Sequence, residues 1–209
     1  QIGQELGVVY IFEGSISRSA SKVRITGRLV NARTDEQMWA NTLDRPLTDL
    51  FEMRAALAKE IAAALRVTLS PPEQSLLQQR PTQNMAAYDL YLRALAVFFP
   101  ITKERIFEAL GLFEQAIAID RHYGPALSWA AICQMRLVMD GWTEEPEANR
   151  RKAIDLARQA LQAAQNDPGI LANVAQVLAY FGEDIGAMIG LVDRALALNP
   201  SYARGWFQS

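Results

Sequence analysis

Side chains capable of acid–base, nucleophilic or metal chemistry are few in this sequence and stand apart from one another. The single histidine, His122, follows a helix stop, and the single cysteine, Cys133, lies in an apolar helical segment. A general base needs a nucleophile within hydrogen-bond reach, and a zinc site needs several sulfur or nitrogen ligands. We therefore expect His122 to be a surface or capping residue and Cys133 to be a small buried hydrophobe.

Neighbouring carboxylates and one tryptophan are the remaining candidates. Glu144 with Glu145, and Glu183 with Asp184, could each supply a two-carboxylate site, but solvated loop charges explain such pairs more often. Trp142 lies in the same loop as the first pair and either folds back onto the helices or contacts a partner. The sequence contains no phosphate loop, G-x-G-x-x-G, nucleophile elbow or H-E-x-x-H motif. It thus predicts no catalytic, metal-binding or cofactor-binding residue.

Composition and charge limit the class of partner. The 209 residues are 50% hydrophobic and 21% charged, which is typical of a globular chain with one large or two small domains. Lys and Arg number 21 against 23 Asp and Glu, so there is no net attraction to nucleic acid or anionic lipid. The apolar stretches are far shorter than the roughly 20 residues that span a bilayer, and no signal peptide opens the chain. We expect a cytoplasmic protein without nucleic-acid or membrane partners and, because Gln1 comes first, a part of a longer chain.

The first 69 residues predict a small sheet with a covering helix. Val23, Ile25 and Leu29 share one face of a segment whose other face is charged or polar, which indicates a half-buried strand. Apolar runs at 8–12 and 37–42 flank it across short polar turns and favour an antiparallel three-stranded meander. Thr48 is expected to cap a helix with apolar residues at three- and four-residue spacing, which would cover the sheet. Prolines in residues 70–83 predict a junction with a second short helix.

Residues 84–209 contain only alanine-rich amphipathic helices, in which one pattern occurs three times. A small or apolar residue is followed by another four positions later, by a small residue after three more, and by a helix stop. The three sets are Ala109, Phe113, Ala116 and Arg121; Ala153, Ala157, Ala160 and Gln165; and Met188, Val192, Ala195 and Pro200. Each set lies on one helix face and predicts stacked hairpins with one hydrophobic seam. The longer interval between the first two sets predicts a long loop at residues 139–146.

This pattern resembles the tetratricopeptide repeat, in which each unit is a helical hairpin and the first helices line a concave groove. Trp206 would begin a further unit. The groove-facing side chains implied by this register are Tyr88, Tyr91, Met135, Arg136, Gln176 and Tyr180. Such a groove would suit an extended peptide or a partner helix. The alternative is that these residues pack between helices, as aromatic residues at helical spacing usually do.

The N-terminal part carries a second resemblance. Residues 5–15, 22–29 and 36–40 are similar to the second half of the TolB-like (FlgO-like) α/β domain, which precedes tetratricopeptide repeats in bacterial regulatory proteins. Residues 49–51, 88–93 and 193–200 fit the same combination. In the form it most resembles, this is the C-terminal half of a class III adenylate cyclase of rhizobial type. The resemblance implies a parent lyase that makes cyclic AMP from ATP with Mg²⁺ or Mn²⁺, and no cofactor in this part.

The sequence therefore predicts an α+β chain with three segments: a partial TolB-like domain over residues 1–69, a junction over 70–83, and tetratricopeptide-like repeats over 84–209. The leading hypothesis is a non-catalytic regulatory or protein-interaction region of an adenylate cyclase. The alternative is the same module behind a winged-helix DNA-binding domain or a protein kinase. The partners expected are a protein or peptide and, because the first strands of the sheet are missing, a second copy of the chain that could cover its open edge.

Overall fold

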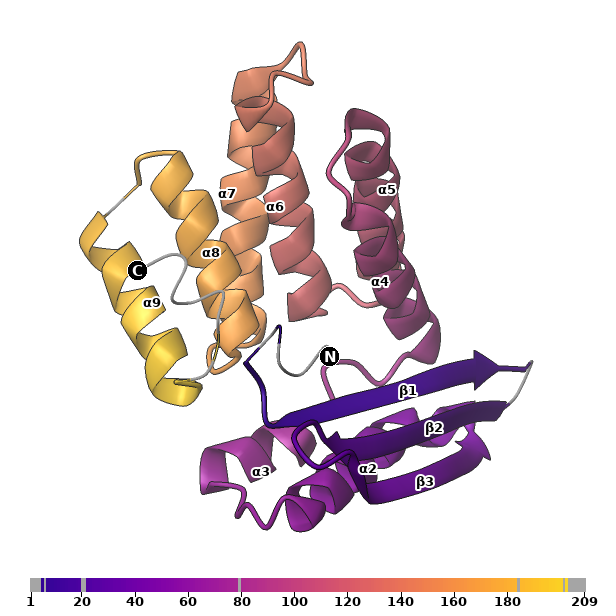
Figure 1. Ribbon diagram of the computed structural model, residues 1–209. Coiled ribbons are helices and arrows are strands. Elements are labelled where there is room, and N and C mark those ends of the chain that lie inside the picture. Colours follow the sequence, from indigo (N-terminus) through magenta and orange to yellow (C-terminus); the bar gives the residue numbers. More distant parts are fainter. Residues whose placement is uncertain are drawn as a thin grey trace. The chain divides into compact units, whose positions relative to one another are not determined.

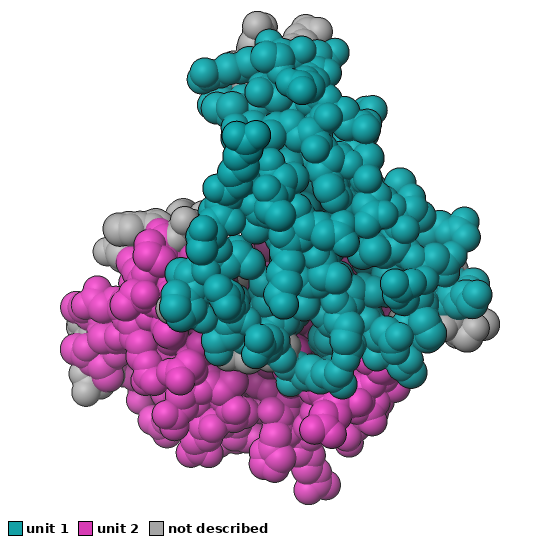
Figure 2. Space-filling view, turned by 90° about the horizontal axis from the view of Figure 1, so that it is seen from below, with its two compact units in different colours: residues 1–80 teal, residues 81–209 magenta. Residues whose placement is uncertain are grey.

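The computed structural model describes residues 5, 7–19, 22–78, 80–183, 185–200 and 202. Within them a three-stranded antiparallel sheet precedes eight helices, which confirms the α+β class (Figure 1). The chain divides into two compact units, residues 1–80 and 81–209 (Figure 2). Trp206, the expected start of a further repeat, lies outside the described residues. In the described part, no helix combines the length and the apolar character that crossing a membrane requires.

The sheet of unit 1 is a meander with one well-buried central strand. Strands β1 (Tyr10–Arg18), β2 (Lys22–Asn31) and β3 (Glu36–Pro46) pair in that order. In β2, the side chains of Val23, Ile25 and Leu29 are buried, while those of Arg24, Thr26 and Arg28 are exposed, as the alternation predicted. The register places Ile25 opposite Ile16 of β1 and Leu43 of β3. The central strand therefore supplies most of the apolar face.

Helix α2 (Leu50–Ala64) covers this apolar face at β2 and β3. Met53 is buried against Val23 and Ile25. Glu60 accepts hydrogen bonds through Oε2 from Trp39 Nε1 at 3.1 Å and from Asn41 Nδ2 at 2.8 Å. A single carboxylate oxygen thus connects the helix to two side chains of β3.

The start of α2 differs from the sequence-based expectation. Leu47–Asp49 form a short 3-10 turn, and Asp49 stands at the N-cap without a side-chain capping hydrogen bond. The Thr48 hydroxyl hydrogen-bonds to Asp49 Oδ1 at 2.8 Å. The prediction of Thr48 as the cap is therefore wrong, because the neighbouring carboxylate engages its hydroxyl. The short helix of the junction, α3 (Pro71–Gln78), does have a capping box, in which Glu73 Oε2 accepts from the Ser70 backbone N–H at 2.7 Å.

Within its described residues, unit 2 consists of three helical hairpins that lie side by side in Figure 1. The pairs are α4 (Met85–Phe98) with α5 (Lys103–Ile119), α6 (Gly124–Met139) with α7 (Pro146–Ala163), and α8 (Pro168–Tyr180) with α9 (Ile185–Leu198). Asn84, Thr102 and Asp167 cap three of these helices, each accepting from backbone N–H groups of the first turn. The loop between α6 and α7 covers residues 140–145, where the sequence predicted a long connection.

The residue sets that recur in the sequence lie in α5, α7 and α9, the second helix of each hairpin. All nine helical members are buried: Ala109, Phe113, Ala116, Ala153, Ala157, Ala160, Met188, Val192 and Ala195. The predicted recurring apolar face is thus present in every hairpin. Because eight of the nine are alanine, valine or methionine side chains without a ring or branch beyond Cβ, neighbouring helices can pack closely along this face.

A buried polar pair interrupts the apolar contact between α6 and α8. Ser128 and Asn173 are 1% and 2% exposed, and Asn173 Nδ2 donates to Ser128 Oγ at 3.2 Å. The Ser128 hydroxyl in turn donates to the carbonyl oxygen of Pro125 at 2.9 Å. Buried polar groups are stable only with such partners, so this pair constrains how the two helices align.

Candidate functional site

The six side chains predicted to face a groove lie on α4, α6 and α8, the first helices of the three hairpins. On α4, the rings of Tyr88 and Tyr91 have centroids 6.4 Å apart. Tyr91 also contacts Phe113 at 6.0 Å and Tyr123 at 5.3 Å, and burial raises the pKa of its hydroxyl. Tyr91 therefore belongs largely to an aromatic cluster between helices, while Tyr88 is half-buried at its margin.

The two predicted residues of α6 have different environments. Met135 is only 1% exposed, so the expectation that it faces a groove is corrected: α5, α7 and α8 pack around α6 and enclose this side chain. Arg136 is partly exposed and forms an ion pair through Nε with Asp140 Oδ2 at 3.2 Å. Arg136 also lies in the last turn of α6, where a positive charge interacts favourably with the helix dipole.

The two predicted residues of α8 remain accessible to solvent. Gln176 is half-buried, and Tyr180 is 43% exposed with its ring edge-on to Phe181 at 4.9 Å. Together with Tyr88 and Arg136 they form the accessible part of the predicted set, which we call the helix-surface residues. They offer aromatic and hydrogen-bonding groups, which suit contact with a peptide better than bond making or breaking.

The titratable candidates of unit 2 lack the surroundings that a catalytic group needs. Cys133 is fully buried, and burial raises the pKa of its thiol, which makes it a poor nucleophile. His122 is exposed in a turn where its backbone N–H donates to Asp120 Oδ1 at 3.1 Å. Glu183 accepts from Arg150 and Arg158 at 3.2 Å each. The predictions that Cys133 is buried and that His122 lies at the surface are both confirmed.

The loop candidates contribute packing and charge. Trp142 is half-buried against the core of unit 2, and its backbone N–H donates to the carbonyl oxygen of Leu137 at 2.8 Å. It therefore folds back onto the helices, the first of the two alternatives. Glu144 and Glu145 are exposed, and Asp184 lies outside the described residues. Over the described part of the chain, no group of three His, Cys, Asp or Glu residues could hold a metal ion.

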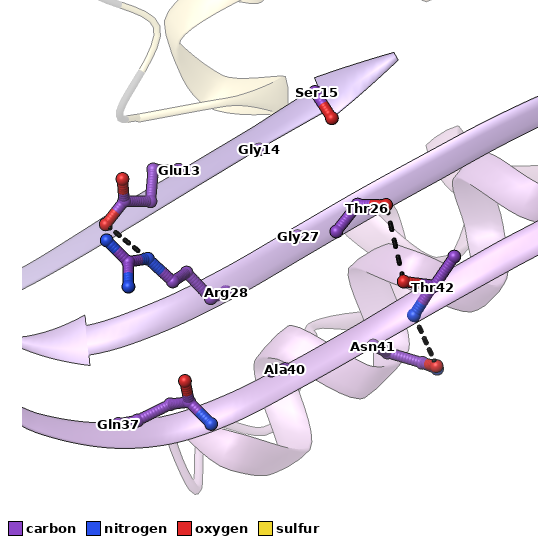
Figure 3. Close-up of a pocket in the computed structure, with 10 residues that line it drawn as sticks. All are labelled: Glu13, Gly14, Ser15, Thr26, Gly27, Arg28, Gln37, Ala40, Asn41 and Thr42. Carbon is purple, nitrogen blue, oxygen red and sulfur yellow. Dashed lines mark hydrogen bonds and ion pairs between the residues drawn. The ribbon is translucent and has the colours of Figure 1, made fainter. Parts of the chain in front are cut away.

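Sequence reasoning missed a polar hollow on the sheet of unit 1 (Figure 3). It has a volume of about 620 Å³ and is lined by residues of all three strands: Glu13, Gly14, Ser15, Thr26, Gly27, Arg28, Gln37, Ala40, Asn41 and Thr42. Gly14 lies opposite Gly27, and a Cβ at Gly14 would come within 2.5 Å of the Thr26 carbonyl oxygen. The close approach of the two strands at this point therefore requires glycine.

Paired side chains flank the hollow on both sides of this glycine contact. Arg28 Nε donates to Glu13 Oε1 at 2.7 Å, and this carboxylate raises the pKa of the guanidinium. The hydroxyls of Thr26 and Thr42 are 3.3 Å apart. Because the Glu13 carboxylate is already paired with the Arg28 guanidinium, the hollow can offer hydrogen bonds to a polar group but has no free nucleophile–base pair. Its only sequence signal is the strand register, which alternation alone does not reveal.

Comparison with known proteins adds a distant relationship. No protein-family model matches the chain. It is 27% identical over 168 residues to a protein of Rhizobium meliloti (strain 1021) that is named "Putative adenylate cyclase 3". The chain is a distant homologue of a protein named as an adenylate cyclase. The alignment covers 80% of this chain but only 29% of the relative, so the chain corresponds to less than a third of that protein.

Proposed function

We propose that this chain is the non-catalytic regulatory region of a larger adenylate cyclase and that it binds a protein or peptide partner. The observation that carries the proposal is the alignment, which extends over most of this chain but over a small part of the relative. In this proposal, ATP and its Mg²⁺ or Mn²⁺ bind elsewhere in the larger protein. The candidate residues are compatible with this proposal, because Glu13 and Glu183 are held in ion pairs with arginines and Cys133 is buried.

The architecture of unit 2 supports a binding role. A single helical hairpin cannot bury its apolar face, so stacked hairpins share a core and present an extended surface to other molecules. We assign the three hairpins to tetratricopeptide-like repeats and the sheet to a partial TolB-like domain. The helix-surface residues Tyr88, Arg136, Gln176 and Tyr180 are the proposed contacts for the partner. A protein that uses ATP in this way would work in the cytoplasm.

Cyclic AMP formation tests the proposal. The purified 209-residue chain is incubated with ATP and Mg²⁺ or Mn²⁺, and cyclic AMP is measured by mass spectrometry next to the intact gene product. We expect product from the intact protein and none from the chain alone. Cyclic AMP made by the chain itself would overturn the non-catalytic role, and none from either protein would overturn the assignment to a cyclase.

A further inference from the structure

Strand β1 has an open edge whose backbone groups can be assigned from the strand register. Within the described residues, β1 pairs with β2 alone. At one end the Val9 carbonyl accepts from the Ala32 N–H at 2.8 Å, and at the other the Ser19 N–H donates to the Lys22 carbonyl at 2.9 Å. In an antiparallel ladder, hydrogen-bonded positions alternate. The odd-numbered residues of β1 therefore bond to β2, and the even-numbered ones direct their N–H and C=O groups to the open edge.

The same even-numbered residues carry exposed apolar side chains. Phe12 lies opposite Leu29 and Ile16 opposite Ile25, so both point to the face of the sheet that α2 covers. The helix packs at β2 and β3, however, and leaves β1 uncovered: Tyr10, Phe12 and Ile16 are 44%, 45% and 73% exposed. A strand with free backbone groups and exposed apolar side chains is prepared for pairing with another strand.

We propose that two copies of this chain pair through antiparallel β1 strands, with the two-fold axis at Gly14, and form a continuous six-stranded sheet. The register about Gly14 lets all nine residues of the strand pair, whereas any other two-fold register shortens the ladder. It places Phe12 opposite Ile16 of the second copy, and Ile16 opposite its Phe12. The proposed dimer does not depend on the proposed cyclase function.

Self-complementarity is the reason for choosing a second copy as the occupant. Phe12 and Ile16 of one copy meet Ile16 and Phe12 of the other on one face, where Tyr10 stands opposite position 18, while Glu13 lies opposite Ser15 of the second copy on the other face. No like charges stand directly opposite each other, and Glu13 is already neutralised by Arg28. A two-fold interface requires such a match of one surface with itself. Because one strand pair is a small interface, we expect a dissociation constant in the micromolar range.

Sedimentation of the full 209-residue chain over a concentration series tests the dimer. Ile16→Lys places a charge at the paired edge, and because this side chain is 73% exposed the substitution is compatible with the folded chain. We expect it to weaken dimerisation about tenfold or more. Ile189→Lys, at an isoleucine of α9 that is 58% exposed, is the matched control and leaves the dimer unchanged. A wild-type chain that stays monomeric, or equal effects of both variants, would refute the proposal.

Disulfide formation tests the register separately. A Phe12→Cys chain mixed with an Ile16→Cys chain is expected to cross-link on oxidation, because paired Cα atoms in such a ladder are about 5.5 Å apart, within disulfide range. Ser17→Cys mixed with Phe12→Cys is the control, since Ser17 points to the opposite face of the strand. Cys133 is buried and does not compete. If Phe12→Cys disturbs the sheet, Tyr10→Cys with Arg18→Cys probes the same axis. Equal cross-linking in the Ser17 control would rule out the Gly14-centred register.

Discussion

At the scale of single residues, two buried groups link the stability of unit 2 to alkaline pH. Burial raises the pKa of the Cys133 thiol and of the Tyr91 hydroxyl, so the folded chain keeps both protons where the unfolded chain loses them. Their contribution is complete below the unfolded-state pKa of Cys, about 8.5, and decreases as the pH rises above it.

A substitution at Cys133 isolates this effect. We expect urea unfolding of the wild-type chain to show a lower free energy of unfolding at pH 10.5 than at pH 8, and Cys133→Ala to reduce that difference. The comparison uses the pH dependence of each variant, because the smaller alanine side chain changes the absolute stability. A pH dependence identical in both variants would mean that the thiol ionises equally in the folded and unfolded states.

Residue environments could be predicted from the sequence where one side of a helix differs from the other. The burial of Cys133 and the exposure of His122 follow from their apolar and turn settings. Met135 could not be predicted, because α6 is surrounded by three helices and its buried positions run around the whole circumference. For such a helix the amphipathic pattern disappears, and with it the information about which side faces solvent.

At the scale of elements, helix α5 provides a matched pair of phenylalanines. Phe113 is completely buried and contacts Tyr91 and Trp129, whereas Phe107 on the same helix is 45% exposed. We expect Phe113→Ala to lower the free energy of unfolding by about 3–5 kcal/mol and Phe107→Ala by less than about 1 kcal/mol. Urea titration followed by far-ultraviolet circular dichroism measures both. Similar losses would contradict the hairpin packing.

The contact of α2 with β3 depends on one carboxylate. Glu60→Ala removes the acceptor of both Trp39 Nε1 and Asn41 Nδ2, and we expect a loss of about 1–3 kcal/mol. Glu60→Gln keeps an acceptor oxygen and should lose less. Lys59→Ala, at an exposed neighbouring position, is the control. Unfolding monitored by tryptophan fluorescence is the measurement, and equal stability of the alanine variants at 59 and 60 would count against this role of Glu60.

The elements themselves were more predictable than their ends and pairings. Alternation in β2 and the recurring alanines of α5, α7 and α9 reflect burial on one face, which a sequence records directly. The prediction of Thr48 as the helix cap was wrong because its hydroxyl can hydrogen-bond either to a backbone N–H or to a nearby carboxylate. The hollow at Gly14 and Gly27 was missed because it arises from a pairing between strands, and neither glycine carries a functional group.

At the scale of the whole molecule, the two units differ in how completely their own residues cover their apolar surfaces. Unit 2 closes a core of its own from three hairpins, whereas the sheet of unit 1 keeps one strand with open backbone groups and exposed apolar side chains. The sedimentation experiment therefore tests a property of unit 1, the open edge of β1.

The Ser128–Asn173 contact has a consequence for any attempt to reuse these hairpins. Alanine and valine surfaces tolerate slippage of one helix along another by a turn, about 5.4 Å, because apolar contacts are interchangeable. A slipped arrangement would separate the serine from the asparagine and leave Asn173 Nδ2 without its acceptor in an apolar interior, at a cost of about 1–3 kcal/mol, while Ser128 would keep its bond to the Pro125 carbonyl. The pair therefore fixes the position of α8 along α6. A chimaera that contains α8 but lacks a serine at the position of Ser128 on α6 would no longer hold α8 in one position.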